Sequence, residues 1–307
     1  MMKRSLFFSA LCGVLAFSAG ASYAKSAPSV VEFFSSERCG DDPGVQAMIR
    51  DAVVADPDVI LINCRITGLN KNDQKDIYSQ EFCDDQKIAY FSRLRLYSPR
   101  NPQIIVDGRY EASNKDVVPA IKASRSLEKV VGLDLSMNDQ RELTFDIPEI
   151  PGDLKVGEII LYTFGPSHQD KIIAFDAMGN PVSTDIDGNV IVPEGVDPAD
   201  MPPVVERHAF PTYFRPVLAR RVLKSWSGEV ETFSFPLKDI MPFEEEAAKV
   251  QGYVVVIQGH KPGEFGGPVL AAGQWKRPDM TPIPLSDLDF PKQLSAPKLP
   301  LKDPVLQ

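Results

Sequence analysis

Cys39 and Asp42 stand where this chain could carry thiol chemistry. Cys39 follows an apolar run, Val30 to Phe34, and a short polar turn, and Pro43 then opens a stretch with helical periodicity. A thiol at a helix N-terminus gains thiolate character from the helix dipole, and thiolates form mixed disulfides. In a C-x-x-C motif the second thiol would stand at position 42, where this chain has Asp42. The spacing therefore indicates either a single nucleophile at Cys39 or a redox site that has lost its dithiol.

Charged neighbours act on the Cys39 thiol in both directions. Arg38 favours the thiolate, whereas Glu37, Asp41 and Asp42 disfavour it, so the sequence leaves the reactivity of Cys39 open. Asp42 is a candidate acid or base for a leaving thiolate. It is also a good helix N-cap, which would contribute about 1 kcal/mol. We favour the capping role.

The other cysteines favour a structural disulfide. Cys12 lies in a segment that we expect to be removed, which leaves Cys39, Cys64 and Cys83. Three cysteines in an oxidising compartment form at most one intramolecular disulfide. Cys64 ends an apolar strand and Cys83 lies in the next helical stretch, so we favour this pair, which would close a loop of about 20 residues and stabilise the fold by roughly 3 kcal/mol. Pairing of Cys39 with either of them, or its attack on their disulfide, stays open.

The N-terminus has the pattern of a secretory signal peptide. Lys3 and Arg4 precede an apolar stretch from Leu6 to Ala19, and Ser22-Tyr23-Ala24 carries the small residues of a cleavage site. We expect residues 1–24 to be removed and the mature chain to be periplasmic or secreted. The apolar stretch is shorter than the roughly 20 residues of a membrane-spanning helix, and no later run approaches that length. We therefore expect no membrane insertion.

The charge and motif content exclude several functional classes. The formal net charge is -9, without a cluster of Lys and Arg, so we expect no nucleic acid partner. The three histidines lack the short spacing of a metal site. No phosphate loop, dinucleotide motif or serine-nucleophile motif is present. We therefore expect no cofactor and no metal.

The first half of the chain alternates between strand and helix patterns. Strand, helix and strand within about 35 residues form a parallel, right-handed crossover. Asp107-Gly108 predicts a hairpin turn. Apolar runs predict strands over 29–34, 59–64, 103–106 and 109–112. Periodic apolar residues predict helices over 43–53 and 114–124, and one or two helices over 73–96.

Three motifs of this half occur together. They are Val31-Glu32-Phe33-Phe34-Ser35-Ser36, Lys75-Asp76 with Phe82, Gln86 and Tyr90, and Asn101-Pro102-Gln103-Ile104-Ile105-Val106-Asp107-Gly108. In this combination the chain resembles a family of exported bacterial thioredoxin-like proteins of unassigned function. The resemblance implies a thioredoxin-like α/β domain over residues 28–127, here with Asp42 in place of the second cysteine. It also implies that Pro102 is the cis-proline facing the thiol, with Pro99 as the alternative.

The second half has the pattern of a β-rich domain. Short apolar runs separated by Gly, Pro and Asp recur between residues 128 and 280 and predict a β-sandwich-like domain. Residues 171–213 do not fit evenly spaced strands, and we expect a long loop with one hairpin there. Residues 281–307 are rich in Pro and Leu without a period and form a C-terminal tail.

Two functions fit these features. The first is an exported binding or scaffold module that uses the cleft near Cys39 and Pro102, with a degenerate C-x-x-D site. The second is a monothiol enzyme that exchanges disulfides through Cys39. The partner is an exported protein or a small thiol in either case, and the sequence does not decide between these two functions.

Overall fold

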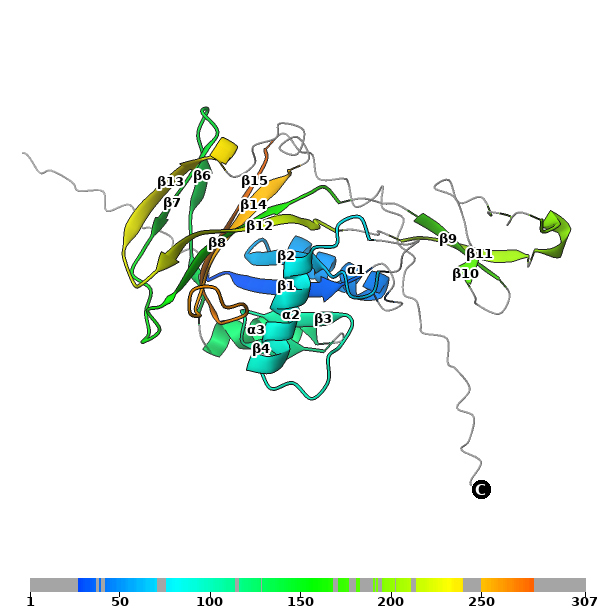
Figure 1. Cartoon of the computed structure of the whole chain (residues 1–307), viewed down its shortest axis with the longest axis horizontal. Coiled ribbons are helices and arrows are strands. Elements are labelled where there is room, and N and C mark those ends of the chain that lie inside the picture. Colours follow the sequence, from blue (N-terminus) through cyan, green and yellow to red (C-terminus); the bar gives the residue numbers. More distant parts are fainter. Residues whose placement is uncertain are drawn as a thin grey trace, which may run out of the picture.

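The computed structural model describes most of the chain between residues 27 and 278. Its strands and helices form a mixed α/β fold with several sheets and few helices (Figure 1). Residues 1–26, the positions flanking Cys39 and residues 279–307 lie outside the described residues. The described residues are 27–36, 39, 42–70, 76–113, 116–127, 129–167, 171–176, 181–182, 190, 192, 195–201, 203–210, 214–239 and 250–278.

The first half builds a four-stranded sheet with the order β2-β1-β3-β4. β1 runs parallel to β2 and antiparallel to β3, and a turn at Asp107-Gly108 joins β3 to β4. The elements of this half are β1 (Ser29–Ser35), α1 (Asp42–Ala55), β2 (Val59–Arg65), α2 (Glu81–Arg93), β3 (Gln103–Val106), β4 (Tyr110–Ala112) and α3 (Val117–Leu127).

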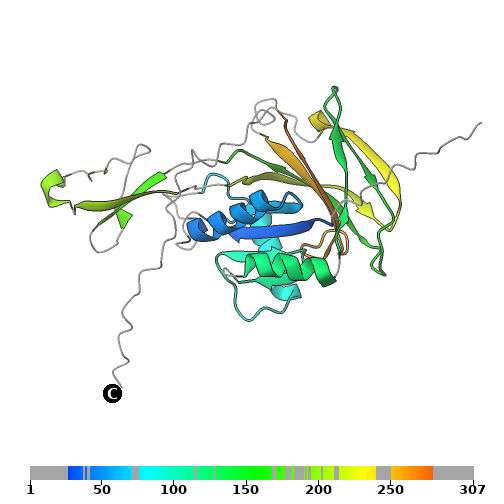
Figure 2. The same ribbon diagram turned by 180° about the vertical axis from the view of Figure 1, so that it is seen from behind.

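The two faces of β1 are covered by different layers. Val31 and Phe33 pack against α1 and α3, whereas Phe34 on the opposite face packs under α2. Figures 1 and 2 show α2 on one side of the sheet and the other two helices behind it. Successive residues of a strand point to opposite faces, so a strand buried on both faces must be apolar at nearly every position. Glu32 is the exception within β1 and is 1 % exposed.

The predicted helix over residues 73–96 is shorter in the structure, because α2 begins at Glu81. The preceding residues 76–80 instead pass along the edge of β2, where Ser79 forms a bridge with Arg65. The backbone N–H of Gln80 donates to the carbonyl of Arg65 at 2.9 Å. The Asp76 carboxylate accepts a bond from the Arg65 side chain at 2.9 Å. These contacts with β2 take the place of the expected helical turns.

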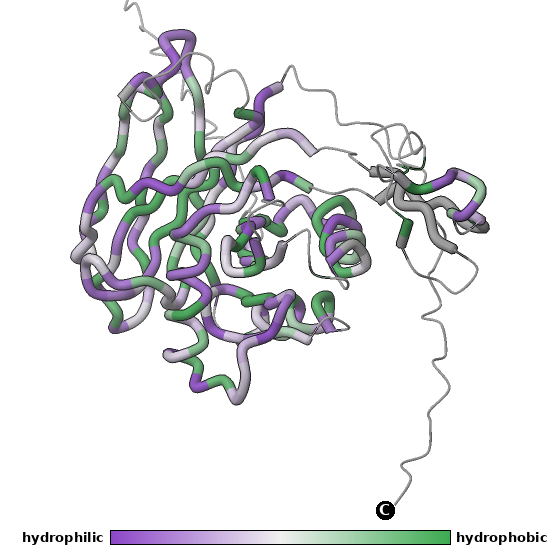
Figure 3. Tube along the Cα trace, turned by 45° about the vertical axis from the view of Figure 1, so that its right-hand side comes forward, coloured by the Kyte–Doolittle hydropathy of each residue, from purple (hydrophilic) through white to green (hydrophobic). Residues whose placement is uncertain are grey.

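The second half is built from strands. A five-stranded sheet, β12-β8-β14-β15-β5, faces a three-stranded sheet, β13-β7-β6, across a core that contains Trp226, Phe145 and Tyr253. Figure 3 colours the trace by hydropathy: hydrophobic and hydrophilic residues alternate along β7 and β13, whereas β8 and β14 are buried at every position. The elements are β5 (Val131–Gly132), β6 (Leu135–Met137), β7 (Glu142–Ile147), β8 (Gly157–Phe164), β12 (Val217–Trp226), β13 (Glu231–Pro236), the 3-10 turn η2 (Leu237–Asp239), β14 (Gly252–Gln258) and β15 (Val269–Lys276).

Residues 171–210 contain three paired strands rather than a loop with one hairpin. β9 (Lys171–Asp176) lies between β10 (Pro181–Val182) and β11 (Val204–Phe210), and both neighbours are antiparallel to it. A 3-10 turn, η1 (Pro198–Asp200), precedes β11. This small sheet extends away from the rest of the molecule (Figure 1). The turn-forming residues Asp187-Gly188 of this segment lie outside the described residues.

The sheets of the two halves pack directly on each other. Val30, Ile60 and Ile62 from the first sheet share a buried cluster with Ile160 and Val254 from the five-stranded sheet. The loop between β14 and β15 also reaches α2, where Arg93 donates to the carbonyl of Gly266 at 2.8 Å. The halves are therefore joined by buried apolar and polar contacts.

Candidate functional site

The end of β1 places Cys39 at the start of α1. The backbone N–H of Cys39 donates to the carbonyl of Ser36 at 2.9 Å, and the N–H of Asp42 donates to the carbonyl of Cys39 at 3.0 Å. Cys39 is 8 % exposed and is not part of a disulfide. Its charged neighbours at positions 37, 38 and 41 lie outside the described residues. The strand end and the turn together hold the thiol beneath the surface.

Asp42 faces inward and binds Arg65 rather than capping α1. Arg65 Nη1 donates to Asp42 Oδ2 at 2.9 Å, and Gln46 Nε2 donates to the same oxygen at 2.8 Å. The helix begins at Asp42 itself, and no backbone N–H of its described first turn donates to this carboxylate. The capping prediction is thus replaced by a buried ion pair. The physical reason is that Arg65, at the end of β2, is fully buried and needs compensating charge.

The Arg65 guanidinium is held by two carboxylates. Its Nε donates to Asp76 at 2.9 Å, while Nη1 binds Asp42. Burial acts to lower the pKa of Arg65, but the two carboxylates outweigh it and the pKa lies above its ordinary value. Burial raises the pKa of Asp42, and the Arg65 charge opposes that rise. Asp42 is therefore committed to a structural contact.

The Asn101–Pro102 peptide bond is cis and lies next to the end of β1. The following residue, Gln103, is paired with Phe34 of β1. Pro102 therefore sits at the same end of the sheet as Cys39. The cis bond precedes Pro102 and not Pro99, the alternative from the sequence. The family resemblance implied a cis-proline at this position.

Lys87 joins this site and was missed from the sequence. It lies on α2, is 9 % exposed, and its Nζ donates to Asn101 Oδ1. Burial lowers the pKa of Lys87, and the charges of Asp84 and Cys39 oppose that fall. Lys87 follows Cys83 by four residues, so the two share one face of the helix. The four-residue spacing from Cys83, which we expected to form a disulfide, was the sequence signal that could have located Lys87.

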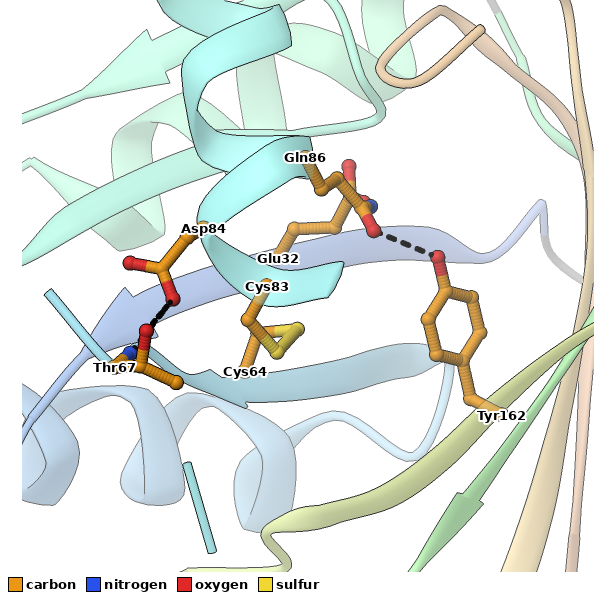
Figure 4. The surroundings of a disulfide bond; sticks show 7 residues. All are labelled: Glu32, Cys64, Thr67, Cys83, Asp84, Gln86 and Tyr162. Atoms are coloured by element: carbon orange, nitrogen blue, oxygen red, sulfur yellow. Dashed lines mark hydrogen bonds between the residues drawn. A yellow bond between two sulfur atoms is a disulfide. The ribbon is translucent and has the colours of Figure 1, made fainter. Parts of the chain in front are cut away.

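The disulfide of the structure joins Cys64 to Cys83. The two Cα atoms are 5.4 Å apart, and both residues are fully buried among apolar side chains between β2 and α2. Figure 4 shows the disulfide below the first turn of α2. Beside it, Asp84 accepts a hydrogen bond from the Thr67 hydroxyl. The bond ties α2, and with it Lys87, to the central sheet.

A second polar cluster surrounds Glu32. Its carboxylate accepts hydrogen bonds from the Tyr90 hydroxyl and the Gln86 amide. Tyr162 in β8 donates to Gln86 Oε1 at 3.1 Å (Figure 4), and Gln258 in β14 donates to the Tyr90 oxygen at 2.6 Å. Burial raises the pKa of Glu32 to about 7, although the two hydrogen bonds act against it. This cluster, the Glu32 network, connects the two halves through buried polar atoms.

The histidines are spread over the second half of the chain. His260 lies in the loop between β14 and β15 and is buried, and its Nε2 lies 3.8 Å from Glu158 Oε2. His208 lies in β11, and His168 is outside the described residues. Within the described part of the chain, no group of three or more His, Cys, Asp or Glu side chains could hold a metal ion. None of the described helices has the length and apolar composition needed to cross a bilayer.

Comparison with known proteins places these residues in a family. The model of the family described as "Protein of unknown function (DUF1223)" matches residues 30–186, slightly more than half of the chain. The chain belongs to the DUF1223 family. The stretch matched by the DUF1223 model contains Glu32, Cys39, Arg65 and Lys87. The Asp42–Arg65 pair therefore lies within the matched region, whereas the Glu32 network extends beyond it through Gln258.

Two solved structures resemble this DUF1223 chain. Protein AGR_C_4864 from Agrobacterium tumefaciens has a TM-score of 0.58 and 16 % sequence identity, over 84 % of this chain and 98 % of the other. HBP35 of Porphyromonas gingivalis has a TM-score of 0.45 and 14 % identity, over 84 % of this chain and 78 % of the other. Among curated proteins, none matches the chain significantly. At this sequence identity, the likeness to the Agrobacterium protein is a likeness of fold alone.

Proposed function

We propose that this chain is an exported thioredoxin-like binding module rather than a dithiol oxidoreductase. The observation that carries the proposal is the buried ion pair between Asp42 and Arg65 at 2.9 Å. In a C-x-x-C protein the resolving thiol stands three residues after the nucleophile. Here that position holds a carboxylate, and its buried partner Arg65 would keep only Asp76 for charge compensation if the Asp42 side chain turned toward Cys39.

The proposal includes the organisation and address of the chain. Residues 1–24 are a cleaved signal peptide, residues 28–127 a thioredoxin-like domain, and residues 128–280 a β-rich domain that supports it. The support for the first domain is the order of its elements and the cis Asn101–Pro102 bond beside Cys39. Mass spectrometry of the mature protein from the periplasm or the medium should give a chain that begins at Lys25.

Insulin reduction with dithiothreitol tests the main point. Wild type and Cys39→Ser should show the same rate, equal to that without protein, because Cys39 has no resolving partner at position 42. The same exported partners should also co-purify with wild type and with Cys39→Ser under reducing conditions. Cys39-dependent insulin reduction would overturn the binding-module proposal.

One observation favours the second candidate, a monothiol enzyme. The Lys87 ammonium is close enough to Cys39 to interact with its charge, and an adjacent cation stabilises a thiolate. In that reaction the Cys39 thiolate attacks one sulfur of a disulfide RSSR, forms Cys39–S–S–R and releases RS⁻. Reaction with an aromatic disulfide reagent should then be fast and should slow at least tenfold in Lys87→Met. An equal rate in both proteins would remove this candidate.

A further inference from the structure

A cavity of about 270 Å³ opens beside Lys87, between α2 and the segment that leads into β3. Its lining includes the apolar residues Leu69, Ile88 and Phe91. It also includes the polar residues Lys87 and Gln103. Binding pockets for drug-sized ligands are usually about 300 to 1,000 Å³, so this cavity suits a small molecule or one residue of a peptide. Its mixture of apolar residues and a few polar groups is typical of a ligand site.

Gln103 brings a buried acceptor to the cavity. The residue is fully buried, and its Nε2 donates to Glu111 Oε1 at 3.1 Å. A carboxylate accepts and cannot donate, so this contact orients the amide with its oxygen on the other side. Gln103 Oε1 has no hydrogen-bond partner among the described residues. A buried carbonyl oxygen of this kind costs free energy until a donor reaches it.

Lys87 brings the complementary charge. Its ammonium carries three N–H donors, and Asn101 Oδ1 accepts one of them. The neighbouring Asp84 also lines the cavity, but its carboxylate already accepts from the Thr67 N–H at 2.7 Å and the Gly68 N–H at 3.1 Å. Lys87 can therefore bind an anionic group at one end of the cavity, while Gln103 Oε1 and the Asp84 carboxylate disfavour a second negative charge.

We propose that this cavity binds the α-carboxylate end of an apolar amino acid. The carboxylate pairs with Lys87, the α-nitrogen donates to Gln103 Oε1, and the apolar side chain packs on Ile88 and Phe91. Phosphate and sulfate fit less well, because their acceptor oxygens would meet Gln103 Oε1 and Asp84. The required chemistry occurs in a free amino acid and in the C-terminal residue of a peptide. The proposal rests on the binding function proposed above and gives it a ligand class.

Isothermal titration calorimetry of the mature wild-type chain tests the proposed ligand class. The four probes are L-leucine, N-acetyl-L-leucine, L-leucinamide and inorganic phosphate. Leucine or N-acetyl-leucine should bind, whereas leucinamide, which lacks the carboxylate, and phosphate should bind at least tenfold more weakly. Tighter binding of leucine would identify a free amino acid. Equal or tighter binding of N-acetyl-leucine would identify a peptide C-terminus.

Two sets of variants, each with its own control, locate the binding site. Lys87→Met should weaken binding at least tenfold and Lys87→Arg should restore most of it, while Lys122→Met, at an exposed position on α3, should bind as wild type. Ile88→Asp changes an exposed residue of the cavity, so it should fold and bind at least tenfold more weakly. Ile77→Asp, at an equally exposed position that does not line the cavity, is its control.

The proposal is overturned if neither leucine nor N-acetyl-leucine binds, if leucinamide binds as tightly as leucine, or if Ile88→Asp binds as wild type. These outcomes leave the insulin result untouched, so a failed ligand assignment is distinguishable from a failed binding function. Conversely, Cys39-dependent insulin reduction would overturn the binding module whatever the titration shows.

Discussion

Arg65 Nη1 lies 2.9 Å from Asp42 Oδ2, and neither side chain is more than 4 % exposed. The pair links the end of β2 to the start of α1, the helix that follows Cys39. Because both charges are out of water, each depends on the other for stability. The position that would hold a second thiol is thus part of the core's charge balance.

Asp42→Ala should therefore destabilise the protein strongly. Removing one partner of a buried ion pair costs about 3 to 5 kcal/mol, and we expect about 3 because Asp76 still binds Arg65. Urea unfolding of wild type and variant measures the difference. Asp51→Ala on the same helix is the control, since its partner contact with Arg50 is largely screened by solvent. Equal losses in both variants would contradict the structural role of Asp42.

Glu32 should make the stability of the protein fall as the pH rises. Burial raises its pKa from the ordinary 4.5 to about 7, so the folded protein holds this proton more tightly than the unfolded chain. The free energy of unfolding should then decrease between about pH 4.5 and pH 7. This rise in pKa corresponds to a loss of about 3 kcal/mol of stability, which is complete above pH 7 and absent below pH 4.5.

Glu32→Gln isolates this effect. The amide keeps its neutral charge at every pH, and Tyr90 can donate to the carbonyl of Gly267, 3.3 Å away, in place of the lost carboxylate oxygen. Relative to wild type, the variant should gain up to about 3 kcal/mol between pH 4.5 and pH 8. Urea unfolding over this range measures it, with the exposed Glu264→Gln as control. A pH-independent difference between wild type and Glu32→Gln would contradict the assignment.

Non-reducing peptide mapping after alkylation should find Cys64 linked to Cys83 and the alkyl group on Cys39. Replacing both bonded cysteines by alanine should lower the free energy of unfolding by about 3 kcal/mol, since the bond closes a short loop. Dithiothreitol should produce a similar loss in wild type and none in the double variant. A peptide that joins Cys39 to either partner would refute the pairing.

Gly108→Ala should disrupt the contact between the two halves. A Cβ at Gly108 would lie 1.8 Å from the carbonyl oxygen of Gly267, and its φ of +64° is also unfavourable for alanine. Gly152→Ala is a matched control, because Gly152 has φ +101° with no atom within 4 Å of the added carbon. Gly108→Ala should cost at least about 2 kcal/mol more than Gly152→Ala in urea unfolding. Similar losses of unfolding free energy in the two variants would show that the loop containing Gly267 moves aside without a large penalty.

The sequence alone determined the elements whose patterns are local. β1, α1 and β2 follow from apolar runs and a 3.6-residue stripe, each bounded by turn residues, and Cys64 and Cys83 are separated by only one loop and a helix turn. Secondary structure of this kind depends on neighbours along the chain. It is therefore visible without coordinates.

Only the tertiary structure decided which side chains meet at the site. Asp42 and Arg65 are 23 residues apart, and Tyr90 and Gln258 are 168 apart, so no periodicity brings either pair together. The start of α2 was misplaced for the same reason, because the Arg65 contacts compete with helix formation over residues 76–80. The pairing of β9 with β11 likewise crosses a long connection. Buried charges and distant strands choose partners by packing, and packing is a property of the folded chain.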